Sequence, residues 1–144
     1  MEPLTIDYKD YIITTDKSLM KVQEIHQWLS EVSYWNKNIP FDTVKTAFDN
    51  SFCIGILKNN RQVGYARLVT DHAILAYLAD VYVLEEHRGK GLAKAMLQIL
   101  FGLDWVKGLR GIMLTTTNTH GLYRQFGFTD CKNPARIMEL SRNP

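Results

Sequence analysis

The spacing of hydrophobic positions changes several times along this chain, and each change marks a predicted element. Residues 11–15 form a short β-type run. Residues 19–32 then carry apolar side chains at helical spacing, behind a candidate N-cap at Asp16 or Ser18. Pro40 is expected to open a second short helix. The chain is therefore predicted to begin with a strand followed by two helices.

The middle of the chain is rich in predicted strands. Residues 51–57 and 62–70 have β-type sequences and flank Asn59-Asn60, a pair that tolerates the positive φ angles of a tight hairpin turn. Residues 73–84 form an apolar run that is broken by Asp80, which is typical of a central strand buried on both faces. We expect these three strands to be neighbours.

Helix and strand patterns alternate in the second half of the chain. Apolar residues recur at helical spacing from Gly91 onward, residues 111–116 predict a strand, and residues 121–126 predict a short helix that Gly127 ends. Residues 136–140 predict a closing strand. This order predicts an α+β (mixed α/β) fold with helices on both faces of one sheet. No linker or repeat interrupts the sequence, so residues 1–144 are expected to form a single domain.

Composition narrows the class of protein. Apolar residues make up 46% of the 144 residues, which is enough for one core, and the net charge is only +2, which argues against nucleic-acid binding. The longest apolar run is too short to span a bilayer, and the N-terminus lacks the pattern of a signal peptide. The two cysteines and four histidines show no ligand spacing, so no metal is expected. We expect a cytoplasmic protein that binds neither nucleic acid nor membrane.

A basic, glycine-rich turn joins the apolar run to the following helix. Glycines allow a ligand to approach the backbone closely, and the free N–H groups at a helix start attract phosphate. The turn is not a Walker P-loop, because Lys90 is followed by Gly91 instead of Ser or Thr. It is not a dinucleotide fingerprint, because Lys94 replaces the third glycine. Taken alone, the turn is either a phosphate site or a simple helix cap.

A second motif further along the chain favours the phosphate site. The segments Glu86-His87-Arg88-Gly89-Lys90-Gly91 and Leu122-Tyr123-Arg124-Gln125-Phe126-Gly127-Phe128 together resemble two motifs of the GNAT superfamily of acyl-CoA N-acyltransferases. Those motifs are Q/R-x-x-G-x-G/A after the fourth strand and a short helix of the form L-Y-x-x-x-G-F. The resemblance covers residues 79–128. Two positions depart from it: Glu86 replaces Gln or Arg, and Thr116 stands where the family often has asparagine, with Asn118 two residues later.

The resemblance implies a GNAT-like fold in which the fourth and fifth strands splay apart around the pantetheine arm of acetyl-CoA. Backbone groups of Val81 and Val83 are then expected to pair with that arm, and Asn118 to contact it. A backbone N–H near Val81 or Tyr82 would face the thioester oxygen. The pyrophosphate would be held by the amides of Arg88, Gly89, Lys90, Gly91, Leu92 and Ala93.

Three side chains are candidates for proton transfer. Tyr123 resembles the general acid of the family, although a core tyrosine that bridges helix and sheet is the alternative. Asp80 is a carboxylate in an apolar strand, which indicates either a general base or a salt bridge. By strand alternation it shares a face with Leu78 and Tyr82. His120 lies three residues before Tyr123 and is either a base or only part of the helix start, and deprotonation through water needs no base at all.

Aromatic residues near the two N-terminal helices are candidates for acceptor recognition. Tyr34 and Trp35 break the helical pattern and predict the lip of a pocket, whereas Trp28 fits better in the core. The expected function is acetyl transfer from acetyl-CoA to a primary amine of a small molecule or protein. The alternatives are an acyl-CoA sensor without turnover and an O-acyltransferase. The sequence leaves the oligomeric state open; dimers are common in this superfamily, so a homodimer is one candidate state.

Overall fold

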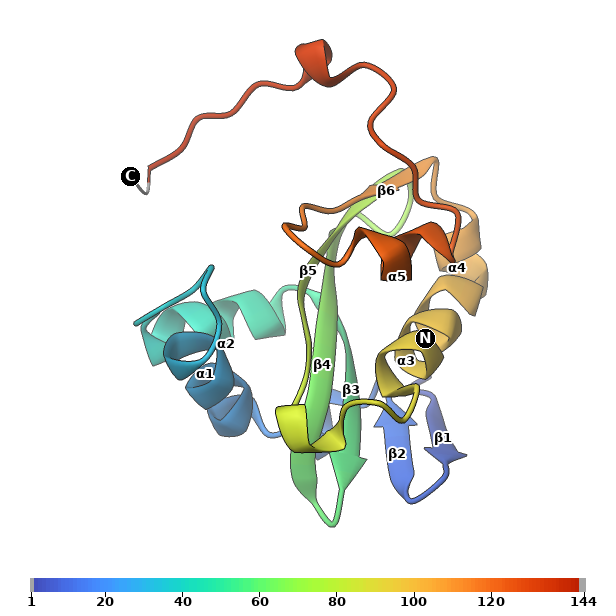
Figure 1. Ribbon diagram of the computed structural model, residues 1–144. Coiled ribbons are helices and arrows are strands. Elements are labelled where there is room, and N and C mark those ends of the chain that lie inside the picture. Colours follow the sequence, from blue (N-terminus) through green and yellow to red (C-terminus); the bar gives the residue numbers. More distant parts are fainter. Residues whose placement is uncertain (1, 143–144) are drawn as a thin grey trace.

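The computed structural model describes residues 2–142, which form one six-stranded sheet with helices on both faces (Figure 1). The strands are β1 (Thr5–Tyr8), β2 (Tyr11–Thr14), β3 (Phe52–Lys58), β4 (Arg61–Thr70), β5 (Leu75–Val83) and β6 (Gly111–Met113). The α-helices are α1 (Val22–Glu31), α2 (Phe41–Asp49), α3 (Leu92–Gly102), α4 (Asp104–Lys107) and α5 (His120–Arg124). Short 3₁₀ turns occupy Lys17–Leu19, Glu85–His87 and Pro134–Arg136. The predicted mixed α/β class is confirmed.

The strands follow one another across the sheet in chain order, β1 to β6. Every pair is antiparallel except β5 and β6, which are parallel. Asn59 and Asn60 have φ angles of 50° and 64°, so the predicted hairpin turn between β3 and β4 is confirmed. Asp16 caps the first 3₁₀ turn, and α1 begins only at Val22, later than the pattern predicted.

The sheet separates two cores. Helices α1 and α2 cover one face with Ile25, Leu29, Val44 and Phe48, which pack toward β3, β4 and β5. Helix α3 covers the other face with four buried side chains, Leu92, Met96, Leu97 and Leu100. Within residues 2–142, no helix is both long and apolar enough to cross a membrane.

Strand β5 contains a β-bulge at Asp80. Tyr82 pairs with Tyr65 but Ala79 pairs with Arg67, so β5 has one more residue than β4 across this interval. Asp80 is the extra residue of the bulge, and its φ angle is +56°. Leu78 therefore packs on the α3 side of the sheet and Tyr82 on the α1–α2 side. The predicted common face is wrong for Leu78, because the bulge shifts the alternation, whereas Asp80 and Tyr82 do share the α1–α2 side.

Strand β5 is also less covered than its apolar sequence predicted. Leu75 and Tyr77 are 57% and 40% exposed, since α1 and α2 do not reach this end of the sheet. Strand β6 pairs with β5 only over Leu75–Tyr77, and it ends at Met113 instead of residue 116. Within residues 2–142, no strand pairs with the remainder of β5, residues 78–83, on the side that faces β6. This is the splay that the resemblance implied, because the predicted fourth and fifth strands, residues 73–84 and 111–116, are β5 and β6 once the unpredicted β1 is counted.

The predicted closing strand at residues 136–140 is wrong. After the turn at Pro134–Arg136 the chain runs away from the body in an extended form, and every residue from 129 to 142 is exposed (Figure 1, red). A strand sequence becomes a strand only beside a neighbouring strand, and none lies next to this segment.

Three buried tyrosines make the fold sensitive to high pH. Burial raises the pKa of Tyr65, Tyr82 and Tyr123 above the ordinary tyrosine value. The unfolded chain loses these protons near about pH 10 while the folded chain keeps them, so the free energy of unfolding must fall as the pH rises further. We expect urea unfolding to show a loss of up to about 1.4 kcal/mol per pH unit for each tyrosine above about pH 10. A Tyr82→Phe variant should lose stability less steeply, and equal slopes in the two proteins would contradict this prediction.

Candidate active site

The free edge of β5 presents backbone groups to the space between β5 and β6. Leu84 donates its N–H to the Val63 carbonyl on β4, at 2.8 Å. In an antiparallel ladder alternate residues face opposite edges, so the backbone groups of Val83 and Val81 point away from β4. Arg88 Nε already uses this edge, donating to the Val83 carbonyl at 3.0 Å. Both valines therefore lie where a strand-like ligand could pair with them.

The glycine turn places the free N–H groups at the start of α3 next to the end of this edge. Gly89 and Gly91 have φ angles of +80° and +77°, a region that other residues rarely adopt. Gly91 is the N-cap of α3, and no side chain caps the helix. The first-turn N–H groups, which include those of Leu92 and Ala93, lack intrahelical acceptors, and the helix dipole adds positive charge. This arrangement suits an anion such as a pyrophosphate.

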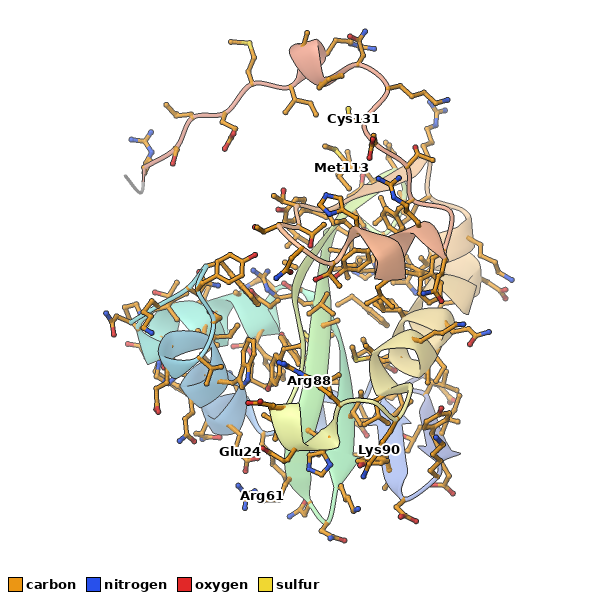
Figure 2. All side chains as sticks on the ribbon, in the orientation of Figure 1. Glu24, Arg61, Arg88, Lys90, Met113 and Cys131 are labelled. Atoms are coloured by element: carbon orange, nitrogen blue, oxygen red, sulfur yellow. The ribbon has the colours of Figure 1, made fainter. Side chains whose placement is uncertain are left out.

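The two basic side chains of the turn are held by the protein itself. Lys90 points toward β2, where its Nζ lies 3.2 Å from the Tyr11 hydroxyl, while Arg88 lies over the end of β5 (Figure 2). The Tyr11 hydroxyl also bonds His87 Nδ1 at 2.8 Å. The positive charges therefore flank the turn, but the backbone amides are the groups left open to bind a ligand.

Tyr123 lies at the other end of the splay. Helix α5 begins at His120, and Gly127 follows with a φ angle of +93°, so its predicted role after the helix is confirmed. Tyr123 is 8% exposed and its ring packs against that of Phe128. Burial raises the pKa of the Tyr123 phenol, and nearby Tyr34 raises it further. The phenol therefore keeps its proton through the neutral range, as a proton donor must.

An open groove of about 1010 Å³ contains Tyr123 and His120. It runs between β6, α5 and the segment that follows Phe128. His120 is exposed at its wall. Asn118 is exposed as well, and its Oδ1 accepts a hydrogen bond from the Thr119 hydroxyl at 3.0 Å. The structure thus brings His120 and Tyr123 to one groove, while Asn118 lies in the loop before α5.

Asp80 is the centre of a polar network on the α1–α2 side of the sheet. Its Oδ2 accepts from Arg67 Nε at 2.7 Å, and its Oδ1 accepts from Trp35 Nε1 at 2.8 Å and from Asn36 Nδ2 at 3.2 Å. Arg67 also donates to the Ser51 hydroxyl at 3.0 Å. The salt bridge that the sequence left open for Asp80 is therefore present, and it anchors the loop after α1 to the bulge.

Sequence reasoning missed Arg67 and Asn36. Arg67 interrupts an apolar strand in the same way as Asp80 does, and two opposite charges in adjacent strands were a signal that could have paired them. Asn36 carried no comparable signal, because its place in the network depends on how the loop folds back.

Removing the charge of Asp80 should destabilise the protein. The side chains of Arg67 and Asp80 are only 18% and 6% exposed, so Asp80→Asn leaves a largely buried guanidinium without a counter-ion. We expect the free energy of unfolding in urea to fall by about 2 kcal/mol. Asp130→Asn is the matched control, because Asp130 pairs with Arg124 on the surface and should change nothing measurable. Equal stability of the two variants would contradict the anchoring role.

The predicted acceptor residues form an aromatic rim beside this network. The Tyr34 hydroxyl donates to Thr117 Oγ1 at 3.0 Å and so links the loop after α1 to the loop before α5. Tyr34 and Trp35 pack edge to face. Trp28 stacks on Tyr82 with ring centroids 4.1 Å apart and is half-buried, in keeping with its predicted place in the core. Tyr34 and Trp35 therefore lie between Asp80 and the loop that leads to Tyr123.

The order of these features along the chain agrees with a known family. A family model described as the acetyltransferase (GNAT) family matches residues 22–128, a range that includes both the glycine turn and Tyr123. The chain belongs to the GNAT acetyltransferase family. It is 33% identical over 142 residues to FG08082 of Gibberella zeae, which its name assigns provisionally to the acetyltransferases, covering 84% of this chain and 80% of that protein.

Solved GNAT structures share the fold. The GNAT-family protein xcc2953 from Xanthomonas campestris pv. campestris superposes with a TM-score of 0.88 at 41% identity, over 91% of this chain and 92% of that one. An acetyltransferase from Clostridium acetobutylicum, solved with acetyl-CoA, has a TM-score of 0.63 at 20% identity, over 97% and 95% of the two chains. The fold and the relatives together identify this chain as an acyltransferase.

Proposed function

We propose that this GNAT protein transfers an acetyl group from acetyl-CoA to a primary amine of a small molecule or protein. The observation that carries the proposal is the uncapped start of α3, which follows the free edge of β5 along the chain. The buried Tyr123 supplies a proton donor. Family membership supports acetyl transfer, and the Clostridium relative solved with acetyl-CoA supports the choice of donor.

The residues present fit acetyl-CoA. The amides from Gly89 to Ala93 would hold its pyrophosphate, whereas the Arg88 amide already donates to the Glu85 carbonyl at 3.1 Å. The backbone groups of Val81 and the N–H of Val83 would pair with the pantetheine arm, because the Val83 carbonyl already accepts from Arg88 Nε. The Val81 N–H points to the gap by strand alternation, whereas Tyr82 faces β4, so Val81 is the better donor to the thioester oxygen. When bound, acetyl-CoA supplies the activated acyl group.

The chemistry requires two proton movements. The amine nitrogen forms a bond to the thioester carbonyl carbon, the carbon–sulfur bond breaks, and the nitrogen loses one proton. Tyr123 donates a proton to the departing sulfur, a role that its buried and protonated phenol suits. The rings of Tyr34 and Trp35 would offer a packing surface to the neutral amine near this point, while the charge of Asp80 is already balanced by Arg67.

The group that takes the amine proton is Asp80, His120 or water. Both oxygens of Asp80 already accept hydrogen bonds, and His120 is the more accessible of the two side chains. The pH dependence of kcat decides among them. Loss of the limb that rises with pH in Asp80→Asn would identify Asp80, and its loss in His120→Gln would identify His120. An unchanged limb in both variants would leave water as the acceptor.

The test of the proposal is release of free thiol from acetyl-CoA in the presence of a panel of amines, with alcohols as the comparison class. We expect turnover with at least one amine and an N-acetylated product in mass spectrometry. Turnover on alcohols alone would make the protein an O-acyltransferase. Tight binding of coenzyme A without turnover on any amine would make it a sensor instead, and either result would overturn the proposal.

A further inference from the structure

The glycine turn packs against the hairpin that β1 and β2 form near the N-terminus. Lys9 Nζ donates to the Lys90 carbonyl oxygen at 3.0 Å, and the Tyr8 hydroxyl donates to the same oxygen at 3.4 Å. Figure 2 shows Lys90 beside these strands. The oxygen belongs to the peptide group that joins Lys90 to Gly91. Two donors from the hairpin therefore hold one peptide group of the turn.

The orientation of this peptide group decides where the Gly91 N–H points. In a planar trans peptide group, the C=O and the N–H point in opposite directions. The Lys90 carbonyl faces the hairpin, so the Gly91 N–H faces away from it. In the part of the chain that the structure describes, no acceptor pairs with this N–H. It is therefore one of the free amides that a pyrophosphate would meet.

Lys9 has a backbone conformation that does not favour lysine. Tyr8 pairs with Tyr11, so Lys9 and Asp10 form a two-residue hairpin loop, and the φ angle of Lys9 is 53°. Glycine, asparagine and aspartate are the usual residues at a loop position with positive φ. A strained residue that persists at one point of a fold suggests a role for its side chain. Lysine supplies what the usual residues lack, a donor long enough to reach the glycine turn.

The hairpin also holds the turn through a buried tyrosine. Tyr11 is 3% exposed and belongs to the core on the α3 side of the sheet. Its hydroxyl bonds His87 Nδ1 at 2.8 Å and accepts from Lys90 Nζ at 3.2 Å, and its ring meets that of His87 edge to face. The hairpin therefore contacts the turn both before and after Gly89, and its own position is fixed by the core.

We propose that Lys9 is a positioning residue for the coenzyme A site. Its ammonium group holds the Lys90 carbonyl toward the hairpin, and the Gly91 N–H is thereby aimed at the pyrophosphate before the ligand arrives. A donor that is already oriented binds more tightly, because it need not be ordered on binding. This proposal rests on the proposed function, since it requires the pyrophosphate to bind at the glycine turn.

Lys58 provides a matched control for charge. A general attraction between lysines and the anionic coenzyme A would need no bond to the turn. Lys58 Nζ lies 5.1 Å from the centroid of the Tyr11 ring, much as Lys9 Nζ lies 5.3 Å from the centroid of the Tyr8 ring. Of the two lysines, Lys9 is the one that bonds the Lys90 carbonyl. Lys58→Met therefore removes an equal charge from the same hairpin surface and leaves the bonds of the turn in place.

Isothermal titration with coenzyme A tests the proposal. We expect Lys9→Met to weaken binding by about 3- to 10-fold, a modest effect because the bond is exposed to water. Lys58→Met should weaken binding by less than about 2-fold, since salt screens an exposed charge that makes no direct contact. Lys9→Arg should keep the wild-type affinity, because a guanidinium also donates to a carbonyl. Equal losses in the two methionine variants, or no loss in Lys9→Met, would overturn the proposal.

A second variant, Lys9→Asn, separates binding from stability. Asparagine tolerates positive φ, so this protein should unfold in urea at no lower concentration than the wild type. Its side chain is too short to reach the Lys90 carbonyl, so coenzyme A should bind it as weakly as it binds Lys9→Met. Wild-type affinity in the folded Lys9→Asn protein would show that Lys9 has no positioning role.

The amide resonance of Gly91 in the free protein gives a readout that needs no ligand. A hydrogen bond to a carbonyl polarises the whole peptide group, so Lys9→Met should shift the Gly91 amide resonance and Lys58→Met should not. An unchanged Gly91 resonance in Lys9→Met would overturn this proposal alone. A wild-type protein that binds no coenzyme A would overturn the proposed function together with it.

Discussion

Replacing Tyr123 by phenylalanine should reduce kcat by about 100-fold or more while leaving the affinity for coenzyme A nearly unchanged. General acid catalysis contributes roughly 10² to 10⁴ in rate, and the hydroxyl is the only group removed. Because burial raises the pKa of Tyr123, the wild-type phenol stays protonated to beyond about pH 10. Activity that depends on this proton should therefore be retained at mildly alkaline pH. Thiol release under saturating substrates measures the effect.

The matched control for this variant is Tyr77→Phe. Tyr77 borders the same groove, and its hydroxyl donates to Thr115 Oγ1 at 3.0 Å. Removing that hydroxyl should change kcat by only a few-fold, since no role in proton transfer is proposed for it. A Tyr123→Phe enzyme with nearly wild-type kcat would contradict the assignment of Tyr123 as the acid, and Tyr123 would then be a packing residue.

Gly91→Val should weaken coenzyme A binding by roughly 5- to 150-fold. A β-branched residue with positive φ stores about 1–3 kcal/mol of strain, and every 1.4 kcal/mol is a factor of ten in affinity. A Cβ at Gly91 would also lie 3.2 Å from the Tyr8 hydroxyl, so that side chain must give by a few tenths of an ångström. Relief of the strain at positive φ moves the amides of the turn out of alignment. Isothermal titration with coenzyme A measures the loss.

Gly102→Val serves as the control because it lies at the opposite end of the same helix. A Cβ there meets nothing within 4 Å, and the backbone is not in the positive φ region. Its affinity should equal that of the wild type. Gly89 adds a second comparison, since a Cβ there also meets nothing, so weaker binding in Gly89→Val would come from the ligand side of the turn and from its φ of +80°. Unchanged affinity in Gly91→Val would contradict the amide cradle.

Periodicity predicted most of the fold but not its irregular points. The helical pattern of α3 and the β-type runs of β3 and β4 reflect burial, which is visible in the order of apolar residues along the sequence. Strand β1 left no such trace because Thr5–Tyr8 is short, and half of it is polar. The bulge at Asp80 was also missed, because the extra residue appears only when the register with β4 is known. Residues 136–140 have a strand sequence, yet within residues 2–142 no strand lies beside them, so they form none.

The candidate site was predicted where chemistry depends on the backbone. A turn with positive φ angles at Gly89 and Gly91 could be predicted because glycine tolerates such angles, and the short helix around Tyr123 could be predicted from its motif. Contacts between side chains could not be predicted in this way. The bonds that hold Asp80 to Arg67, Trp35 and Asn36 join three separate segments, and only the folded chain brings them together.

The central claim is that main-chain amides between Arg88 and Ala93 bind the pyrophosphate of coenzyme A. An NMR titration of the labelled protein with coenzyme A tests it residue by residue. The account predicts that the largest amide shifts fall on Gly89, Gly91, Leu92 and Ala93, with smaller shifts at Val81 and Val83. Shifts concentrated elsewhere, with the turn unchanged at saturation, would contradict it.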